Sequence, residues 1–435
     1  MHAMPVTEPR KAASRPPWRT DLTVLLLIVI ATSVPFWIAG ERLDIALQRP
    51  FYAPVAGGQP WHLQNRFPWR QLYLYGTLPA LATAVAAAVV AAASFLRPRL
   101  RRWRPHALFL VLTMAVGPGL LVNGLFKDHW GRPRPRQIKQ FGGTWDYQAP
   151  LVKGPSGRGK AFPCGHSSTG YYFVALFFLL RRRHKALAIA ALAAGVALGT
   201  LIGMARMAAG AHFASDVVWS AHLTLLPAFV LYYGVLRIPA QARAAQADGP
   251  AGRVRWVGAV LVAGMAVGIA AAALLVLRPL YLEIRHSAPR ATARVPLSLD
   301  CAAADLTLTF TNLADQAFVI GGDAQGFGVP WATFNPSLQT APGAGAAYCF
   351  TAQPRGYFRE LRVSLAVLVD PSAVDRLTVR VGHGTIRVQS ATPLPPPPLE
   401  ITLDNGDLTV AESLRTNMVV RRNPGGASAC RYLGE

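Results

Sequence analysis

Three short clusters of basic residues, histidines and one carboxylate carry the chemistry of this chain. In chain order they are the segments KDHWGRPRP (127–135), PCGHSS (163–168) and RMAAGAHFASD (206–216). Lysine and arginine bind phosphate oxygens, an imidazole attacks phosphorus or transfers a proton, and a carboxylate orients an imidazole. These residue types therefore predict a site that binds and transfers a phosphoryl group.

The basic residues of the first and third clusters predict the phosphate contacts. Lys127, Arg134 and Arg206 supply three fixed positive charges for the oxygens of a phosphoryl group during transfer. Arginine engages two oxygens with its planar fork, whereas lysine acts as a point charge. Pro133 and Pro135 restrict the backbone around Arg134. Lys127 alone also fits a second interpretation, an anchor that reaches the headgroup region from a helix end.

The second cluster is predicted to open a membrane helix. Free N–H groups and the positive end of the helix dipole make a helix start a seat for phosphate. Gly165 lets the backbone approach a ligand closely, and His166 would stand beside the scissile bond as a proton donor. In the alternative interpretation Ser167 and Ser168 cap the helix and His166 faces water.

The third cluster predicts the nucleophile. His212 and Asp216 are four residues apart, so on a helical turn they share a face. A carboxylate bonded to one imidazole nitrogen fixes the tautomer and leaves the other nitrogen free to attack. His212 would form a phosphohistidine that water later cleaves. The alternative is a structural hydrogen bond that ties the loop to the helix.

These residues, in this order, resemble the three-part signature of the type 2 phosphatidic acid phosphatases, a superfamily that includes bacterial lipid phosphatases and the soluble vanadium haloperoxidases. The resemblance covers residues 70–240 and implies a six-helix membrane core and a reaction without metal or cofactor. The tract KDHWGRPRPRQ with the following FGG also looks like bacterial lipid A phosphatases. The implied roles are His212 as nucleophile, His166 as general acid, Asp216 as partner of His212, and Lys127, Arg134, Arg206, Cys164 and Gly165 as phosphate binders.

Two positions depart from the family pattern, which usually has serine where this chain has Cys164 and Ala205. A thiol is a weaker hydrogen-bond donor than a hydroxyl. Losing one such bond costs about 1–3 kcal/mol of transition-state stabilisation. We therefore expect reduced activity, and a reactive Cys164 if the surrounding positive charge stabilises its thiolate.

Composition indicates a membrane protein with a soluble part. Hydrophobic residues make up 52% of the 435 residues and charged residues only 15%. The net charge is +23, and the basic residues lie mostly between the apolar runs. The sequence has no aromatic–basic module of the kind that binds nucleic acid. Nucleic acid is therefore not the predicted partner. The predicted position of the site, at headgroup level, favours a phosphorylated membrane lipid.

Seven apolar runs are predicted to span the membrane, the first as an uncleaved anchor. They are 22–39, 72–96, 106–126, 165–180, 186–204, 217–236 and 256–277. The N-terminal tail and the short basic loops between spans share one side, which the positive-inside rule assigns to the cytoplasm. All three clusters and the region after Arg278 then lie outside, at the periplasmic face of a bacterial inner membrane. The loop 127–164 is basic but external, which favours an anionic ligand there.

The region after Arg278 shows the alternation typical of strands, at 306–310, 377–381, 385–389 and 399–410. Asn405–Gly406 predicts a two-residue hairpin, and the proline run 393–398 predicts an extended connector. We expect a β-rich periplasmic domain, a sandwich, with a possible envelope partner. An oxidising compartment permits one disulfide among Cys301, Cys349 and Cys430.

The predicted fold is mainly α: a polytopic membrane helical bundle, with a six-helix core and a seventh helix, followed by a β-rich domain. The predicted divisions are a cytoplasmic tail (1–21), the phosphatase domain (22–240), a cytoplasmic linker (241–255), the seventh helix (256–277) and the periplasmic domain (286–435). The predicted function is hydrolysis of a phosphate monoester or diphosphate on a lipid headgroup. Two alternatives remain open: a phosphotransferase that uses the same phosphohistidine, and a catalytically impaired protein that binds lipid phosphate.

Overall fold

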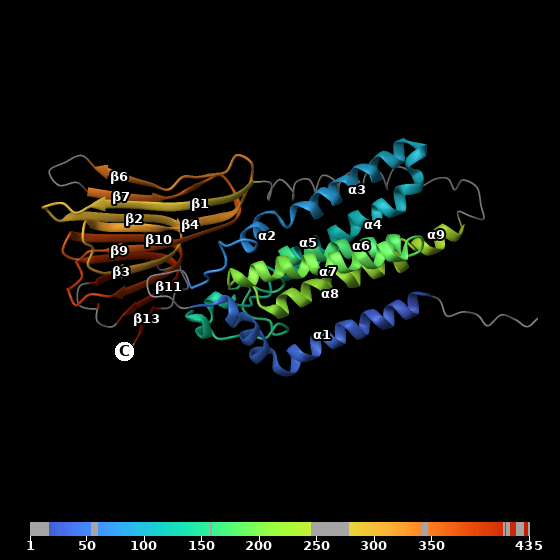
Figure 1. Cartoon of the computed structure of the whole chain (residues 1–435), viewed down its shortest axis with the longest axis horizontal. Coiled ribbons are helices and arrows are strands. Elements are labelled where there is room, and N and C mark those ends of the chain that lie inside the picture. Colours follow the sequence, from blue (N-terminus) through green and yellow to red (C-terminus); the bar gives the residue numbers. More distant parts are fainter. Residues whose placement is uncertain are drawn as a thin grey trace, which may run out of the picture.

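The computed structural model describes residues 17–53, 60–156, 159–244, 278–341, 347–411, 414, 418–422 and 430–433. Its helices all precede residue 245 and its strands all follow residue 277, apart from isolated bridges and short turns. Figure 1 shows these two parts end to end along the longest axis of the molecule. We call them the helical bundle (17–244) and the β module (278–433).

The helical bundle is built from long apolar helices. Its α-helices are α1 (Pro17–Gln48), α2 (Trp69–Tyr75), α3 (Leu78–Leu96), α4 (Arg104–Met114), α5 (Gly165–Tyr171), α6 (Ala175–Leu180), α7 (Lys185–Ala208), α8 (Ala214–Val230) and α9 (Ile238–Ala244). Wider π-helical turns extend α4 through Ala115–Phe126 and α8 through Leu231–Val235, and a 3₁₀ turn, Tyr172–Val174, joins α5 to α6.

Five of these helical stretches are long and apolar enough to cross a membrane. They are Trp18–Phe51, Trp69–Leu96, Pro98–Phe126, Lys185–Ala208 and Ala214–Gln241. They contain five of the seven predicted spans, so the protein is a membrane protein. The predicted span 165–180 corresponds to α5 and α6 with the turn between them, which is shorter. The predicted seventh span, 256–277, and most of the predicted linker lie outside the described residues.

Close packing of α7 fixes the position of the third cluster. A Cβ added at Gly199 would lie 2.5 Å from the ring of Tyr171 on α5, and one at Gly203 would lie 2.4 Å from Val217 on α8. Small residues at these positions let three backbones approach one another, as in other membrane bundles. Arg206 lies in the last turn of α7, just beyond these contacts.

The β module is a single curved sheet with one small additional pair of strands. Its strands are β1 (Arg278–Pro289), β2 (Val295–Ala303), β3 (Asp305–Phe310), β4 (Gln316–Gly328), β5 (Thr333–Phe334), β6 (Ser337–Ala341), β7 (Ala347–Ala352), β8 (Pro354–Arg355), β9 (Phe358–Val369), β10 (Val374–Ser390), β11 (Leu399–Ala411), β12 (Met418–Arg422) and β13 (Cys430–Leu433). Eleven of them form one sheet, and β5 pairs with β8. One apolar core runs through the module from β1 to Leu414.

The predicted hairpin at Asn405–Gly406 is wrong, and so is the sandwich. The segment 399–411 is one continuous strand, β11, which runs parallel to β10. Gly406 has φ 136°, and a Cβ there would lie 1.8 Å from the carbonyl oxygen of Gly384, so glycine is needed where the two strands kink side by side. The same Asn–Gly pair that favours a hairpin therefore serves here inside a strand. The other strand predictions are confirmed, although 377–381 and 385–389 belong to one strand.

No disulfide links the cysteines whose side chains the structure describes. Cys164, Cys301 and Cys349 are free. Cys349 on β7 lies opposite Ser298 of β2, three residues from Cys301, so the two side chains point to opposite faces of the sheet. The side chain of Cys430 lies outside the described residues.

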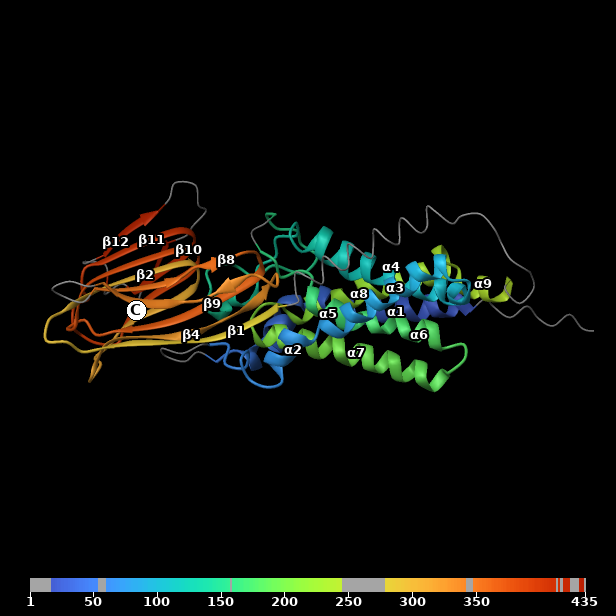
Figure 2. The same ribbon diagram turned by 90° about the horizontal axis from the view of Figure 1, so that it is seen from above.

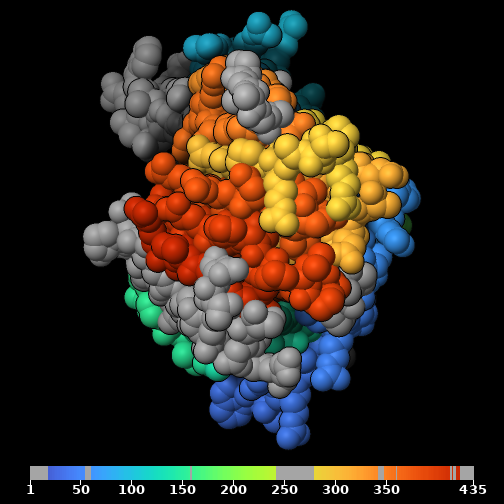
Figure 3. Space-filling view, turned by 90° about the vertical axis from the view of Figure 1, so that its left-hand side faces the viewer, coloured from blue at the N-terminus to red at the C-terminus, as the bar shows by residue number. Residues whose placement is uncertain are grey.

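The β module covers one end of the bundle. In Figures 1 and 2 it stands at the end where the loop 127–164 and the end of α7 lie, whereas the basic turns after α3 and α6 lie at the other end. Seen along the long axis from the β side, the strands hide much of the bundle behind them (Figure 3). The three sequence clusters therefore lie together at the covered end.

Candidate functional site

Backbone hydrogen bonds join the three clusters into one structure. The N–H of Arg136 donates to the carbonyl of Gly210 at 3.1 Å, and the N–H of Cys164 donates to the carbonyl of Asp216 at 3.2 Å. The hydroxyl of Ser220 also donates to the Cys164 carbonyl at 2.8 Å. These hydrogen bonds hold segments that are far apart in the sequence in fixed positions relative to one another.

The start of α5 lies against Lys127. A Cβ added at Gly165 would lie 2.7 Å from Asn123 Oδ1 and 3.4 Å from Lys127 Nζ. Glycine is therefore what allows these polar side chains to reach the helix start. Ser167 and Ser168 do not cap that start, because their hydroxyls donate backward to the carbonyls of Cys164 and Gly165.

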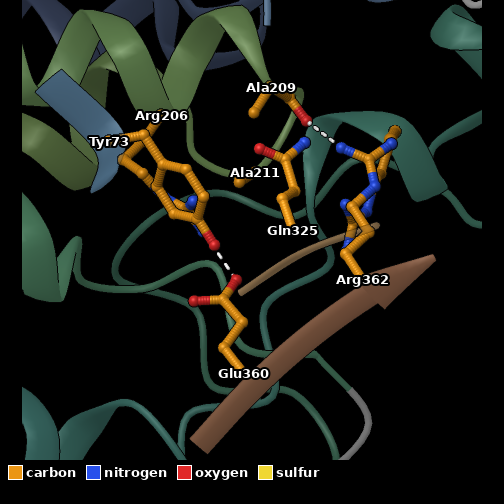
Figure 4. Close-up of a pocket in the computed structure, with 8 residues that line it drawn as sticks. Tyr73, Arg206, Ala209, Ala211, Gln325, Glu360 and Arg362 are labelled. Carbon is orange, nitrogen blue, oxygen red and sulfur yellow. Dashed lines mark hydrogen bonds and ion pairs between the residues drawn. The ribbon is translucent and has the colours of Figure 1, made fainter. Parts of the chain in front are cut away.

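Arg206 lies beneath an aromatic pair at the same place. Its guanidinium carbon is 4.3 Å from the ring centroid of Tyr73, on α2. The Tyr73 ring is in turn 5.4 Å from the ring of His166. Figure 4 shows Tyr73 and Arg206 side by side at the cavity between the bundle and the β module. Arg206 is buried, so its charge acts through a medium of low polarity.

His212 is buried and held in one tautomer. Its Nδ1 lies 2.5 Å from the carbonyl oxygen of Ala161, and because a carbonyl only accepts, Nδ1 carries the proton. Burial and the positive charges of Arg206, Arg134 and Lys127 lower the pKa of His212 well below its ordinary value. The imidazole is therefore neutral at neutral pH, with Nε2 as the nitrogen that carries a lone pair.

Asp216 lies near His212 but bonds mainly to other groups. Its Oδ2 is 3.8 Å from His212 Nδ1, too far for a hydrogen bond, and accepts the N–H of Phe213 at 2.7 Å. The two residues do not share a helical turn, because α8 begins at Ala214 and His212 precedes it. The contact that fixes the imidazole is thus the backbone carbonyl of Ala161, and Asp216 adds a nearby negative charge.

Asp216 belongs to a buried ion network that the sequence did not reveal. Arg132 contacts Asp216 through Nη1 and Asp44, on α1, through Nη2 at 2.8 Å. Asp44 also accepts the hydroxyl of Tyr147 at 2.8 Å and the backbone N–H of Ser215 at 3.0 Å. The side chains of the three charged residues have no exposed surface. Such a network stabilises the fold only when every member is paired.

Cys164 is fully buried, in an apolar cluster that includes Tyr171 and Phe213. Burial raises the pKa of its thiol, which outweighs the hydrogen bond from Ser167 and the charge of Arg206. The condition for a reactive thiolate at this position is therefore not met.

The positive residues crowd one another. Burial, together with the neighbouring charge of Arg136, lowers the pKa of Arg134 to about 10. Burial and the charge of Arg362, on β9, likewise lower the pKa of Arg136 to about 10. Both remain charged at neutral pH, and their mutual repulsion favours an anion between them. Among the described residues no group of three or more His, Cys, Asp or Glu side chains is placed to hold a metal ion.

The structure brings together the predicted site residues and adds others that the sequence analysis missed. Arg132 stands two residues before Arg134 in the first cluster, and its position there was the only available signal. Asp44 follows the predicted apolar run 22–39, beside Glu41 and Arg42, and only the structure shows that helix α1 continues through it. Tyr73 and the β-module residues had no local signal.

Known proteins resemble the same part of the chain. Residues 106–239 match the sequence profile of the PAP2 superfamily. That stretch contains all three clusters.

Two curated relatives that match part of this chain are named lipid A 4'-phosphatases. The protein of Francisella tularensis subsp. novicida is 41% identical over 132 residues, which are 30% of this chain and 59% of the relative. That of Rhizobium leguminosarum is 37% identical over 122 residues, 27% of this chain and 51% of the relative. The chain thus spans between half and three fifths of the length of these relatives.

A crystal structure of a transmembrane PAP2 type phosphatidylglycerolphosphate phosphatase from Bacillus subtilis also aligns with this chain. The alignment covers 53% of this chain and 97% of the chain in that crystal structure. The identity is 19% and the TM-score is 0.31.

Replacement of Arg132 by methionine tests the buried network. It leaves the carboxylates of Asp44 and Asp216 buried without their cation, which costs about 3–5 kcal/mol of unfolding free energy. Chemical unfolding in detergent micelles measures this loss. Arg66→Met removes an exposed arginine and is the control, with a change within about 0.5 kcal/mol. An equally small change in both variants would contradict the role of the network.

The pH dependence of phosphate release tests the charge around His212. Phosphoryl transfer to His212 would need the neutral imidazole, so on this assignment activity falls as pH drops through the lowered pKa of this residue. Lys127→Met removes a positive charge that disfavours the imidazolium, so this pKa rises and the acid limb of kcat/KM moves to higher pH. Lys153→Met, at an exposed position of the same loop, should leave the limb in place. A limb that stays put or moves to lower pH in Lys127→Met would contradict the assignment.

Proposed function

We propose that this protein is an integral membrane lipid phosphatase that works through a phosphohistidine on His212. The observation that carries the proposal is the neutral, buried imidazole held by Ala161 among three fixed cations. An imidazole so placed has its nucleophilic nitrogen free and its charge state set before the substrate arrives. The cations supply binding for a phosphoryl group.

The first half-reaction transfers the phosphoryl group to the protein. The lone pair of His212 Nε2 attacks phosphorus, and the bond from phosphorus to the lipid oxygen breaks. Protonated His166 gives its proton to the leaving oxygen. The positive charge that develops on the His212 ring is stabilised by the Ala161 carbonyl and by Asp216 at 3.8 Å.

The second half-reaction returns the protein to its starting state. Neutral His166 takes a proton from water, whose oxygen attacks phosphorus as the bond to Nε2 breaks. Inorganic phosphate leaves, and His166 is again protonated. Lys127, Arg134 and Arg206 serve both halves because the oxygens of the phosphoryl group keep their charge throughout.

For the substrate we propose a lipid A-type glycolipid phosphate. The support is the 41% identity to a protein named lipid A 4'-phosphatase, across the segment that holds the site. The site also lies at the ends of the membrane-spanning helices, so a headgroup can enter while the acyl chains stay in the bilayer. A polyprenyl diphosphate such as undecaprenyl diphosphate, or a glycerophospholipid phosphate, would bind by the same phosphate contacts.

The proposed location is the inner membrane of a bacterium, with the N-terminus in the cytoplasm. The basic turns after α3 and α6 support this, because they lie at the end of the bundle away from the site (Figure 1). In this arrangement the phosphatase domain of residues 22–240 presents its site to the periplasm, and residues 286–435 form a periplasmic domain there.

Release of phosphate from a purified lipid tests the function. Wild-type protein in detergent micelles is incubated with lipid A labelled at its phosphates. We expect inorganic phosphate to form, and His212→Ala to lower the rate at least about a thousandfold. His184→Ala changes an exposed histidine at the far end of the bundle and should keep the wild-type rate.

The same experiment separates the alternatives. Label that appears on an added lipid acceptor instead of in inorganic phosphate would identify a phosphotransferase. Equal rates in wild type and His212→Ala would contradict the proposal, as would loss of turnover on addition of EDTA. No release from a panel of lipid phosphates would favour a binding protein.

A further inference from the structure

A carboxylate of the β module enters the phosphate site. Glu360, on β9, places its Oε1 2.8 Å from Nη2 of Arg206. Figure 4 shows Glu360 directed away from its strand, toward Tyr73 and Arg206. This is a charge-assisted hydrogen bond of the kind that a phosphate oxygen would make to the same arginine.

The charges around Glu360 are those of the proposed site. Burial alone would raise the pKa of this carboxyl, but Arg206, Arg134, His166 and Lys127 hold it well below its usual range. Glu360 is therefore ionised. Each of these four residues also has a role in the proposed reaction, so the carboxylate occupies the region where the phosphoryl group would bind.

A small cavity lies beside this contact. It is lined by Tyr73, Arg136, Arg206, Ala209, Ala211, Gln325, Glu360 and Arg362. It has room for about one water molecule. With Glu360 in place, a phosphorylated sugar headgroup does not fit into this cavity.

Further contacts, both polar and apolar, hold the β module in this position. Arg362 donates to Gln64 Oε1 at 2.6 Å and to the carbonyl of Ala209 at 3.1 Å. The ring of Phe327 lies 5.5 Å from the ring of His166. Phe327 also packs with Tyr73 and Leu74 of α2 in a small apolar cluster. Two parts of one chain move relative to each other unless the interface between them is large and hydrophobic.

We propose that the β module is a built-in competitor of the substrate, in which Glu360 takes the place of a phosphate group until a lipid phosphate displaces it. This inference rests on the proposed function. A phosphate monoester carries up to two negative charges and three acceptor oxygens, against one charge and two oxygens for the carboxylate. A substrate phosphate can therefore replace Glu360 among the cations, and the β module moves away from the bundle as it does so.

The competition has a measurable consequence. The apparent affinity of any phosphate is lowered by the fraction of molecules in which Glu360 occupies the site. The loss of apparent affinity should be largest for small phosphates, because they gain no binding energy from acyl chains. A lipid phosphate in the bilayer can offset the cost with contacts outside the site.

Inorganic phosphate binding to full-length protein tests the proposal without requiring turnover. Isothermal titration calorimetry in detergent micelles is run on wild type and Glu360→Gln, which keeps the shape of the side chain and removes its charge. We expect the Kd for inorganic phosphate to fall roughly tenfold or more in the variant. Glu283→Gln, an exposed glutamate of β1, is the matched control and should bind as wild type does.

A second variant acts on the docking contact alone. Arg362→Gln removes hydrogen bonds to the bundle and leaves Glu360 intact, so it should also tighten phosphate binding, by a smaller factor. Thermal unfolding in the same micelles confirms that both variants are folded.

The kinetic counterpart uses p-nitrophenyl phosphate, a soluble monoester. Glu360→Gln should lower KM for it with kcat unchanged or raised. Unchanged Kd in Glu360→Gln, or a fall in kcat with no change in KM, would overturn the proposal and assign Glu360 to the positioning of Arg206. Failure of the proposed function can be told apart from failure of this inference. If the proposed function is wrong, wild type releases no phosphate, but tighter binding of inorganic phosphate by Glu360→Gln would still support the competition.

Discussion

The repulsion among like charges at one end of the bundle is the constraint on which the rest of this structure depends. Lys127, Arg134 and Arg206 are all close enough to lower the pKa of His212. Cations gathered in a poorly solvated place need an anion among them. In this structure Glu360 of the β module supplies it. In the proposed reaction a phosphoryl group takes over that role, so the same electrostatic need explains both the chemistry and the contact between Glu360 and Arg206.

A second group of charges, behind the first, is fully paired and serves as support. Arg132 lies between Asp44 and Asp216, with no exposed surface on any of the three side chains. The network connects α1, the loop after α4 and the start of α8, which are the elements that carry or flank His212. In the proposed scheme the cations around His212 can exchange Glu360 for a phosphate. The partners of Arg132, in contrast, are fixed by burial. That difference lets the site change its occupant without loss of the fold.

Local patterns in the sequence were sufficient for much of this arrangement and insufficient for the rest. The helices, and the start of α5 at Gly165, follow from apolar runs and a glycine that short-range rules detect. Glu360 is separated from Arg206 by 154 residues, and Asp44 from Arg132 by 88, so neither pairing has a local signature. The hairpin predicted at Gly406 failed because glycine at positive φ suits a kinked strand as well as a turn. The partner of His212 Nδ1 is a backbone carbonyl, which residue types cannot reveal.

The central claim, that His212 receives the phosphoryl group, is tested most directly by trapping the intermediate. Protein turning over a lipid substrate labelled in its phosphate is quenched in alkali, where phosphohistidine is stable, and its peptides are analysed by mass spectrometry. We predict label on the peptide that contains His212, bonded to Nε2 because Nδ1 is held by Ala161. Steady release of phosphate with no label on the protein, or with label on another residue, would contradict the account.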